Sequence, residues 1–438
     1  MTLPERAKAH LWGDISKMSD DPGRFAKNPS ADFTRIRKLG FENLMRFLIS
    51  MQSDTTAHEL LKFFDYDIST LSNSAFYQQR QKLLPTAFPY LLRQFNSHFP
   101  LVLYKGKYNL VGCDGCEFNI DRNPYDPDTF HPSSGRSARG FNSMHTISLY
   151  DLLSKRYLDC VFQPGMKKNE FRAICDLVDR YSYSGCPIFI ADRGFSSYNV
   201  FAHAIEKGSL FLIRTKDVNV RRLLKLDTLP DDLDTDVNII LSRTQSTKKW
   251  SRPDFADMYR YVSSEVQFDY IKSGSCDEYP LSLRIVRFQV VEGIFENIIT
   301  NLPPDDFRAD EIKQLYHLRW GIETSFRDLK HTIGTINFHS KKPVYIEQEI
   351  WARLILFNFC AIITLHVVIV QNDTKHVYQV NFSMAIKICH HFIRLRKHNP
   401  PLDVEALIGS YTLPIRFDRN FARQHRFQPP ASFCYRFS

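Results

Sequence analysis

The spacing of hydrophobic residues changes near residue 101, which divides the chain into regions of different predicted structure. Between residues 33 and 97, apolar residues recur at helical intervals, as in FENLMRFLISM, and this pattern predicts amphipathic helices. Asp54 and Ser72 each stand just before such a stretch and are predicted to cap the helices that follow. The first hundred residues are therefore expected to form a helical region.

The last of these predicted helices, SAFYQQRQKLL, has hydrogen-bonding side chains on its outer side, and they belong to Tyr77, Gln78, Arg80, Gln81 and Lys82. A helix with such a face can enter the major groove of DNA. The preceding turn, DYDISTLS, is however longer than a tight helix-turn-helix would use. A solvated face of a helical bundle is the alternative, and the pattern leaves both open.

From residue 101 onward the pattern predicts a sheet with helices packed on it. Three consecutive strands are followed by helix, strand, helix and strand: YNLVGCDGCEFNI, MHTISLYDL, RYLDCVFQ, NEFRAICDLVDRYS, CPIFIADRG, SSYNVFAHAIEKG and SLFLIRTK. The near-continuous apolar runs of the last two strands favour central, parallel positions. The fold class is therefore α/β, with a mixed sheet.

Residues 215 to 304 interrupt this order with short alternating runs, VNIILS, MYRYVSS, LSLRIVRFQVV and ENIITNL. Such runs are typical of antiparallel strands, so we interpret this stretch as a β-rich insertion. Helical signals resume at residue 306, in a first turn rich in Asp and Glu that suits the positive end of a helix dipole. The tail after residue 373 is predicted to be helical, then irregular and basic, with Arg394, Arg396, Lys397, Arg416, Arg419, Arg423 and Arg426.

One apolar run, LILFNFCAIITLHVVIV at residues 354 to 370, approaches the length of a membrane span. It is at the short end of that range and contains Asn358 and His366, so we predict a buried helix. The N-terminal residues carry charges throughout and lack the apolar core of a signal peptide. The chain is therefore expected to be cytoplasmic, with no membrane partner.

The net charge of +9 and the pI near 9.0 favour a polyanionic partner, most commonly nucleic acid. A basic protein without such a partner is the alternative on charge alone. Nine cysteines, an odd number scattered along the chain, do not resemble a disulfide framework. Cys113 and Cys116 are spaced as a C-x-x-C motif, but within a strand that spacing places them on opposite faces and argues against a zinc site.

The stretch YHLRWGIETSFRDLK, at residues 316 to 330, predicts a single amphipathic helix with an unusual polar stripe. Tyr316, Arg319, Glu323 and Lys330 fall within about 60° of arc on such a helix. Beside them runs an apolar stripe, and Gly334 follows as a stop signal; the stripe consists of Leu318, Ile322, Phe326, Leu329 and Ile333. A solvated face with an i,i+4 pair between Arg319 and Glu323 is the plainer interpretation.

Two further acids change that interpretation. Asp114 lies in VGCDGCEF on the first strand, and Asp192 ends the fourth strand in IFIADRGF, each close to a glycine. Acids at such strand ends can converge as oxygen ligands of hard cations, although each alone could be a helix cap. Three neighbouring carboxylates repel one another unless cations intervene, and two Mg²⁺ ions roughly 3.5–4 Å apart would polarise a phosphodiester from both sides. Mn²⁺ is the expected substitute.

The pattern Tyr-x2-Arg-x3-Glu-x6-Lys resembles the signature of DDE transposases of the insertion sequence four family. The ADRG around Asp192 and the Asp-Gly at Asp114 are similar to the same family. The resemblance implies a ribonuclease-H-like core interrupted by a β-rich insertion. It also implies that Asp114, Asp192 and Glu323 bind two Mg²⁺ ions, and that Tyr316, Arg319 and Lys330 hold the phosphates of the transposon end.

The implied activity is cleavage of double-stranded DNA at the ends of an insertion sequence and joining of the 3′-hydroxyls to target DNA. Both steps are phosphoryl transfers, and the need for two ends implies a homodimer on DNA in the nucleoid. Two alternatives stay open: a catalytically silent DNA-binding regulator, and a metal-dependent DNA nuclease without strand joining.

One departure from the family pattern concerns a base-stacking Trp that some relatives carry on the last insertion strand. The run IFENIIT has none, Phe295 is adjacent, and Trp250 has no predicted place, so base flipping and a hairpin route stay undecided. The predicted domains are an N-terminal helical DNA-binding region (1–100), the first part of the core (101–214), the β-rich insertion (215–304), the second part of the core with the Glu323 helix (305–372) and the C-terminal helical and basic tail (373–438).

Overall fold

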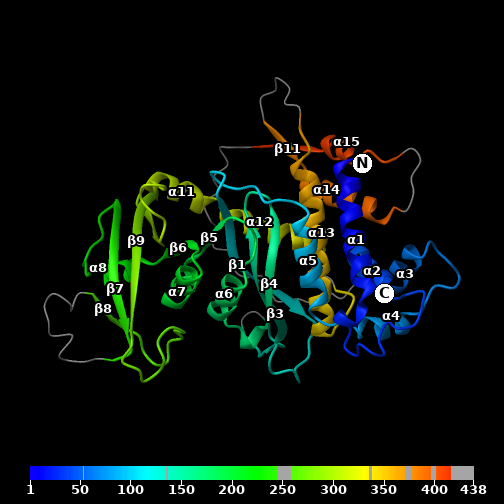
Figure 1. Cartoon of the computed structure of the whole chain (residues 1–438), viewed down its shortest axis with the longest axis horizontal. Coiled ribbons are helices and arrows are strands. Elements are labelled where there is room, and N and C mark those ends of the chain that lie inside the picture. The colour runs from blue at the N-terminus through cyan, green and yellow to red at the C-terminus, as the bar shows by residue number, and fades with distance from the viewer. Residues whose placement is uncertain are drawn as a thin grey trace.

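The computed structural model describes residues 1–52, 54–134, 137–244, 258–334, 338–369, 377–395 and 401–415. The helices are α1 (Leu3–Asp20), α2 (Phe41–Ser50), α3 (Thr56–Phe63), α4 (Asn73–Arg80), α5 (Ala87–Ser97), α6 (Glu170–Asp179), α7 (Tyr198–Glu206), α8 (Asp217–Leu224), α11 (Ala309–His317), α12 (Trp320–Arg327), α13 (Pro343–Leu365), α14 (Phe382–Arg394) and α15 (Val404–Gly409). Figure 1 shows the strands between the helices of the two chain ends and an extension formed by residues after α7.

The strands are β1 (Tyr108–Ile120), β2 (Phe130–His131), β3 (Phe141–Asp151), β4 (Arg156–Pro164), β5 (Cys186–Ala191), β6 (Leu210–Thr215), β7 (Leu233–Ser242), β8 (Tyr259–Tyr261), β9 (Glu278–Val291), β10 (Ile294–Thr300), β11 (Tyr378–Val380) and β12 (Thr412–Pro414). One large sheet has the order β2-β3-β1-β5-β6-β10-β9-β7-β8, with β4 paired to β3. Strands β11 and β12 form a separate pair.

The centre of the sheet is parallel, as the apolar runs predict. Strand β5 lies between β1 and β6 and is parallel to both. Strand β3 runs antiparallel to β1, and β10 runs antiparallel to β6, so the sheet is mixed. The predicted α/β class with a mixed sheet and packed helices is confirmed in this form.

The β-rich stretch is hydrogen-bonded into the same sheet as the central strands. Strand β10 pairs with β6 from Thr300 opposite Leu212 to Asn297 opposite Thr215. Strands β9 and β7 then continue the ladder outward, which gives the long extension seen at one side of Figure 1. Helix α8, in the same stretch, is not anticipated by the alternating pattern.

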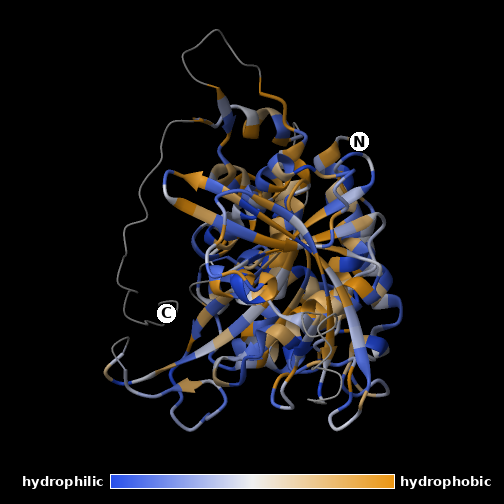
Figure 2. Ribbon diagram, turned by 90° about the vertical axis from the view of Figure 1, so that its left-hand side faces the viewer, coloured by the Kyte–Doolittle hydropathy of each residue, from blue (hydrophilic) through white to orange (hydrophobic). Residues whose placement is uncertain are grey.

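Two hydrophobic cores lie on the two faces of the sheet. One core contains Cys113 and lies under α6, α7 and α8. The other contains Cys116 and joins β1 to the N-terminal helices and to α11–α14. The two cysteines thus lie on opposite faces, as strand geometry predicts. Apolar colour is concentrated along these inner strands and helices in Figure 2.

Helix α13 is the central helix of the second core. It is long and apolar enough to span a membrane, but 89% of its most apolar window is buried inside the protein. The predicted buried helix is therefore confirmed, although it begins at Pro343 and ends at Leu365. The apolar residues that follow do not extend it, and Val368 is exposed.

The N-terminal helices differ from the prediction in their beginnings. Helix α1 starts at a capping box in which Thr2 and Glu5 exchange side-chain and backbone hydrogen bonds, and it is missing from the sequence-based prediction. Thr55, and not Asp54, caps α3. Ser72 caps α4 as predicted, because its side chain accepts a hydrogen bond from the backbone of Ala75.

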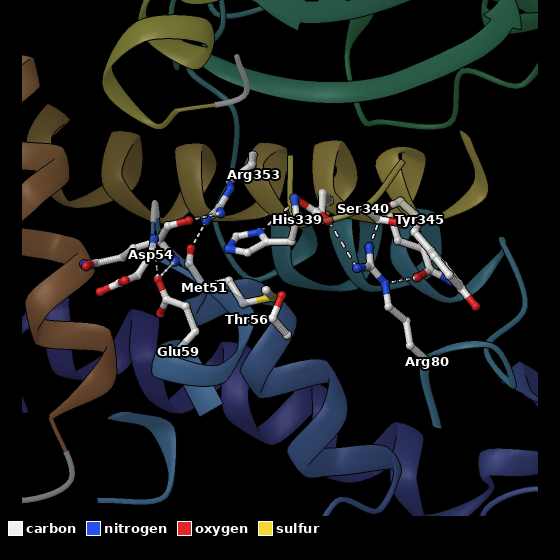
Figure 3. A network of polar contacts seen from close by, with 12 residues as sticks. Met51, Asp54, Thr56, Glu59, Arg80, His339, Ser340, Tyr345 and Arg353 are labelled. Atoms are coloured by element: carbon white, nitrogen blue, oxygen red, sulfur yellow. Dashed lines mark hydrogen bonds and ion pairs between the residues drawn. The ribbon is translucent and has the colours of Figure 1, made fainter. Parts of the chain in front are cut away.

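The polar side of helix α4 is only partly exposed, so it matches neither a fully solvated helix face nor a helix whose whole polar side could contact DNA. Arg80 is fully buried and donates to Gln348 and Glu349 of α13 at 2.8 and 3.1 Å. Tyr77 donates to the backbone carbonyl of His339 at 2.7 Å. Figure 3 shows this polar network between α13 and the N-terminal helices. The prediction is wrong for these two side chains because Arg80 bonds to α13 and Tyr77 bonds to the segment just before it.

Glu349 makes this network sensitive to acid. Burial alone would raise its pKa, but the hydrogen bond from His339 and the nearby charges of Arg80 and His339 outweigh that and lower the pKa to about 2. A depressed pKa stabilises the fold above the ordinary value of 4.5, and this contribution is lost as the pH falls towards 2.

We therefore expect the urea midpoint of the protein to fall between about pH 4.5 and pH 2. A Glu349→Gln variant should be less stable at neutral pH and should show a smaller loss in the same interval. An equally steep acid loss in that variant would contradict the assignment to Glu349.

The basic tail residues Arg396, Lys397, Arg416, Arg419, Arg423 and Arg426 lie outside the described residues.

Candidate active site

The segment that carries the polar stripe is not the single helix that the sequence predicts. Helix α11 ends at His317, α12 begins at Trp320, and a π-helical turn over Asp328–Thr332 follows α12. At the junction, backbone hydrogen bonds join residues three apart, as from Arg319 to Tyr316 at 3.1 Å. Leu318, at the break, is 40% exposed, whereas the rest of the predicted apolar stripe is buried, namely Ile322, Phe326, Leu329 and Ile333.

The two aspartates lie side by side where the parallel β1–β5 ladder ends: Asp192 follows the last residue of β5, but Asp114 lies in the middle of β1 and not at a strand end as predicted. Cys113 of β1 faces Ala191 of β5 in the ladder, so the next residues, Asp114 and Asp192, are neighbours across the sheet. The Asp192 side chain does not cap the short turn that follows it. The Asp114 carboxylate accepts a hydrogen bond from the backbone of Gly115 at 2.8 Å.

Arg319 connects the acids of the sheet to the acid of the helix. Its Nη2 lies 2.8 Å from Oε1 of Glu323, and its Nη1 lies 3.6 Å from Oδ2 of Asp114. Its side chain is only 4% exposed. Tyr316 completes the group, because its hydroxyl donates to Oδ1 of Asp192 at 3.4 Å. The three predicted acids and two of the three predicted phosphate-binding residues therefore meet in one place.

The Arg319 guanidinium is buried without using all of its donors. Among the described residues, its Nε and Nη1 have no hydrogen-bond partner. A buried donor without a partner is costly, and such exceptions point to a ligand or an ordered water. Nη1 is nearest to Asp114, so an anionic oxygen that entered between Asp114 and Glu323 would meet available N–H groups.

Electrostatics inside the group follow from burial and mutual repulsion. Burial raises the pKa of Asp114 to about 6, Arg319 opposes the rise, and the charges of Glu323 and Asp192 add to it. The three carboxylates are thus close enough for the charges of two of them to raise the pKa of the third. Burial also raises the pKa of Tyr316, and the nearby Asp192 adds to this against Arg319, so the phenol stays a hydrogen-bond donor.

Lys330 lies against strand β1, beyond Asp114 in the direction of the C-terminal end of that strand. It is carried by the π-helical turn, and its ammonium lies 5.4 Å from the centre of the Phe118 ring of β1. It also lowers the pKa of the Cys116 thiol, against the larger effect of burial. Because side chains alternate along a strand, Asp114, Cys116 and Phe118 lie on one face, and Lys330 contacts that face at Cys116 and Phe118.

Two charged residues of the site are missing from the sequence-based prediction. Arg214 of β6 lies with Nε 3.7 Å from Oδ1 of Asp192, and its Nη1 contacts Glu296 of β10 at 2.7 Å. In the sequence, Arg214 is recognisable as a charged residue near the end of the apolar strand SLFLIRT. That strand lies next in the sheet to β5, which Asp192 follows directly. Glu296 could be placed only once the β6–β10 pairing was known.

Of the two aromatic residues named above in connection with base stacking, the structure describes only Phe295. Phe295 is half-buried, and the guanidinium of Arg287 lies 4.6 Å from its ring centre. One face of Phe295 is therefore already covered. Trp250 lies outside the described residues.

The carboxylates of Asp114, Asp192 and Glu323 are groups of the chemical type that binds divalent cations. Carboxylate oxygens are the ligands that Mg²⁺ and Mn²⁺ prefer, and a cation would relieve the repulsion from Glu323 and Asp192 that adds to the larger effect of burial on the pKa of Asp114. Within the described part of the chain, however, no three Asp, Glu, His or Cys side chains are gathered closely enough to hold an ion. Arg319 stands between Asp114 and Glu323 and supplies the positive charge in this arrangement.

Comparison with known proteins gives one family match. A family model described as "Transposase DDE domain" matches residues 117–359, which is more than half of the chain. The matched range contains Asp192, Glu323 and the polar stripe, and it begins shortly after Asp114.

Individual relatives match over smaller parts. The putative transposase InsL of insertion sequence element IS186A from Escherichia coli K12 is 24% identical over 189 residues, which cover 41% of this chain and 51% of that protein. The transposase of IS421 from Escherichia coli matches to the same extent. Transposase InsG of IS4 from Escherichia coli K12 is 39% identical over 54 residues, or 12% of each chain. The chain thus spans about half the length of the first two relatives.

A solved structure of the piggyBac transposase synaptic complex with hairpin DNA has a TM-score of 0.41 and 10% identity, covering 92% of this chain and 83% of that one. At this TM-score the likeness supports no statement about function. The family match rests on the sequence, and it includes the helix with Glu323 and the strand end with Asp192. The chain belongs to the family described as "Transposase DDE domain", and the relatives it resembles over part of its length are transposases of insertion sequence elements.

Proposed function

We propose that this protein cleaves DNA at the ends of its own insertion sequence and joins the freed 3′-hydroxyls to target DNA. The observation that carries the proposal is the meeting of Asp114, Asp192 and Glu323 around Arg319, from two strands and a helix far apart in sequence. Such a group of acids beside a buried cation suits the binding and activation of a phosphodiester.

In this proposal each residue has a role that its surroundings support. Asp114, Asp192 and Glu323 hold the divalent cations, two Mg²⁺ with Mn²⁺ as substitute. When bound, the metals polarise the phosphodiester and the attacking oxygen. Arg319, whose Nε and Nη1 have no hydrogen-bond partner among the described residues, binds a phosphate oxygen of the transposon end, Tyr316 donates a hydrogen bond, and Lys330 acts as a point charge.

The wider organisation follows from the same proposal. The sheet with its two acids is a ribonuclease-H-like core in two parts, 101–214 and 305–372, interrupted at 215–304. Residues 1–100 and 373–438 are assigned to DNA binding. Two ends must be processed together, so we infer a homodimer assembled on double-stranded DNA, in the cytoplasm with the nucleoid.

The first experiment identifies the DNA ends. Inverted repeats that flank the coding region, bracketed by short direct duplications, would define the substrate. The purified protein is then mixed with labelled ends, supercoiled plasmid and Mg²⁺. Joined product on the plasmid is the expected result. Cleavage without joining would favour the nuclease, and binding without cleavage would favour the silent regulator.

A substitution at Arg319 tests whether this residue binds a phosphate. Arg319→Lys keeps the charge but removes the planar fork that can hold an oxyanion with two N–H groups, so we expect nicking to fall by about tenfold or more. Single-turnover nicking of a labelled end measures it. Arg327→Lys, on the exposed side of α12, is the matched control and should keep the normal rate. Equal rates in the two variants would remove the clamp role from Arg319.

A further inference from the structure

Three adjoining hollows run along the helical layer between α14 and the N-terminal helices. The first, of about 410 Å³, is lined by residues of α1, α2 and α3 and by the end of α14. It shares Lys62 and Arg394 with the second, of about 470 Å³. The second shares Gln52 with the third, of about 400 Å³, which reaches Thr332 in the turn that carries Lys330. We call the three together the basic groove.

The lining of the basic groove is strongly cationic. Its lysines and arginines are Lys8, Arg46, Lys62, Arg353, Lys387 and Arg394. Among the described residues that line it, the acids are Asp54 and Asp65. Figure 3 shows Asp54 and Arg353 near the α14 end of the polar network, where the third hollow lies. Lys62 is paired with Asp54 at 2.7 Å, and Arg353 is buried and donates to the carbonyl groups of Met51 and Gln52, so the surplus of positive charge comes from Lys8, Arg46, Lys387 and Arg394.

The carboxylates that neutralise two of these cations lie outside the groove lining. Arg46 pairs with Glu42 at 2.5 Å, and Arg394 pairs with Glu59 at 3.6 Å, but neither glutamate lines a hollow. Arg46 also lies over the ring of Trp12 at 5.2 Å, which fixes its position. Both arginines line the first hollow, and the Nε of Arg46 has no hydrogen-bond partner among the described residues.

Lys8 is held by carbonyl oxygens in the first hollow. It donates to the backbone of Phe392, at 2.8 Å, and of Leu395 at the end of α14. Burial and, to a smaller extent, the neighbouring charge of Arg46 together lower its pKa to about 8. The local field is therefore positive, and a phosphate anion that entered would relieve the repulsion between Lys8 and Arg46.

We propose that the basic groove binds the phosphodiester backbone of the DNA that leads away from the candidate active site. The proposal rests on the proposed function and extends it, because the groove ends at the turn that carries Lys330. Positive charge without base-reading geometry suits backbone contacts that set position and affinity. The groove would thus join the N-terminal helices and α14 into one DNA-contacting surface.

The test measures DNA binding by the full chain without divalent metal. Fluorescence anisotropy of a labelled duplex is recorded over a salt series for the wild type and for Arg46→Gln, Lys8→Gln and Lys387→Gln. Each groove variant is expected to bind roughly 3- to 10-fold more weakly at about 0.1 M salt, with the salt slope reduced by about 1. Lys387 is exposed, so its variant keeps the test valid if the more buried changes disturb folding.

Two exposed cations away from the groove serve as matched controls. Arg93→Gln on α5 and Lys207→Gln after α7 should keep both the affinity and the salt slope of the wild type. Groove variants that nick DNA normally and keep the full salt slope would overturn the groove and leave the proposed function standing. A wild type that binds no DNA would overturn both.

A second arm separates DNA from small anions. Inorganic phosphate is titrated into the protein, and its effect on the thermal midpoint is compared between the wild type and Arg46→Gln. Stabilisation of the wild type alone, together with unchanged DNA affinity in the variant, would make the groove a site for free phosphate and overturn the backbone assignment. Loss of DNA affinity in the variant supports the assignment.

Discussion

The Glu323→Ala variant is expected to lose Mg²⁺-dependent nicking of a transposon end by about 10³-fold or more, while its affinity for that end in the absence of metal stays within about threefold. Glu323 supplies one of the three carboxylates and also holds Arg319 at 2.8 Å. Removal of this side chain therefore takes away a candidate metal ligand and releases the guanidinium. Single-turnover nicking and metal-free anisotropy measure the two effects.

Glu311→Ala is the matched control for this variant. Glu311 lies on the neighbouring helix α11, where it contacts Tyr104 and Lys105 away from the acids of the site. Its loss should leave nicking close to the wild-type rate. If Glu323→Ala nicked DNA at an undiminished rate, Glu323 would have no part in the chemistry and the proposed site would have to be abandoned.

The largest effect on stability is expected from Arg80→Met. Arg80 is fully buried and holds Glu349, which is 3% exposed, through a contact of 3.1 Å. Removal of one member of a buried ion pair leaves the other charge buried, and Glu349 would keep only His339 as a partner, so we expect a loss of about 3 kcal/mol in the free energy of unfolding. Urea and thermal midpoints, measured by circular dichroism, give the result.

Two comparisons make this prediction specific. Gln78→Met, at an exposed position of the same helix, should change stability by less than about 0.5 kcal/mol. The double variant Arg80→Met/Glu349→Met should regain part of the loss, because an apolar pair of similar volume can replace a buried ion pair. A double variant no more stable than Arg80→Met alone would show that the cost lies in packing and not in charge.

The strands around the site were predictable because each has a simple burial pattern. The central strands β5 and β6 are buried on both faces, so their apolar runs indicate both the strand and its parallel neighbours. The spacing of Tyr316, Arg319 and Glu323 likewise indicated a common face. That part of the site depends on local periodicity, which a single sequence records.

The break at Arg319 could not be predicted in the same way. Every residue from Tyr316 to Ile322 is compatible with a continuous helix, and the i,i+3 hydrogen bonds at the junction arise where the segment packs against β1. Tertiary contacts therefore decide the local backbone. The same holds for Arg80, because polar residues predict exposure unless a partner such as Glu349 is known in advance.

Helix α1 was missed for a different reason. Its sequence holds a recognisable start signal, Thr2 followed three residues later by Glu5, with a proline between them. Charged residues are spread along the segment, so the apolar positions Ala7, Leu11 and Ile15, which are fully buried, form only a narrow stripe in the sequence pattern. Here the information was present in the sequence, whereas the pairing of β6 with β10 requires knowledge of which distant segments meet.

That pairing has a consequence for any attempt to shorten the protein. Strand β10 satisfies the outer hydrogen-bonding edge of β6, from Leu212 to Thr215. Excision of residues 215–304 as a module would leave an apolar strand next to Asp192 with open backbone donors and acceptors, which is a template for aggregation. A minimal catalytic fragment must therefore retain the β9–β10 hairpin as a cover for the sheet, even if the outermost strands β7 and β8 are removed.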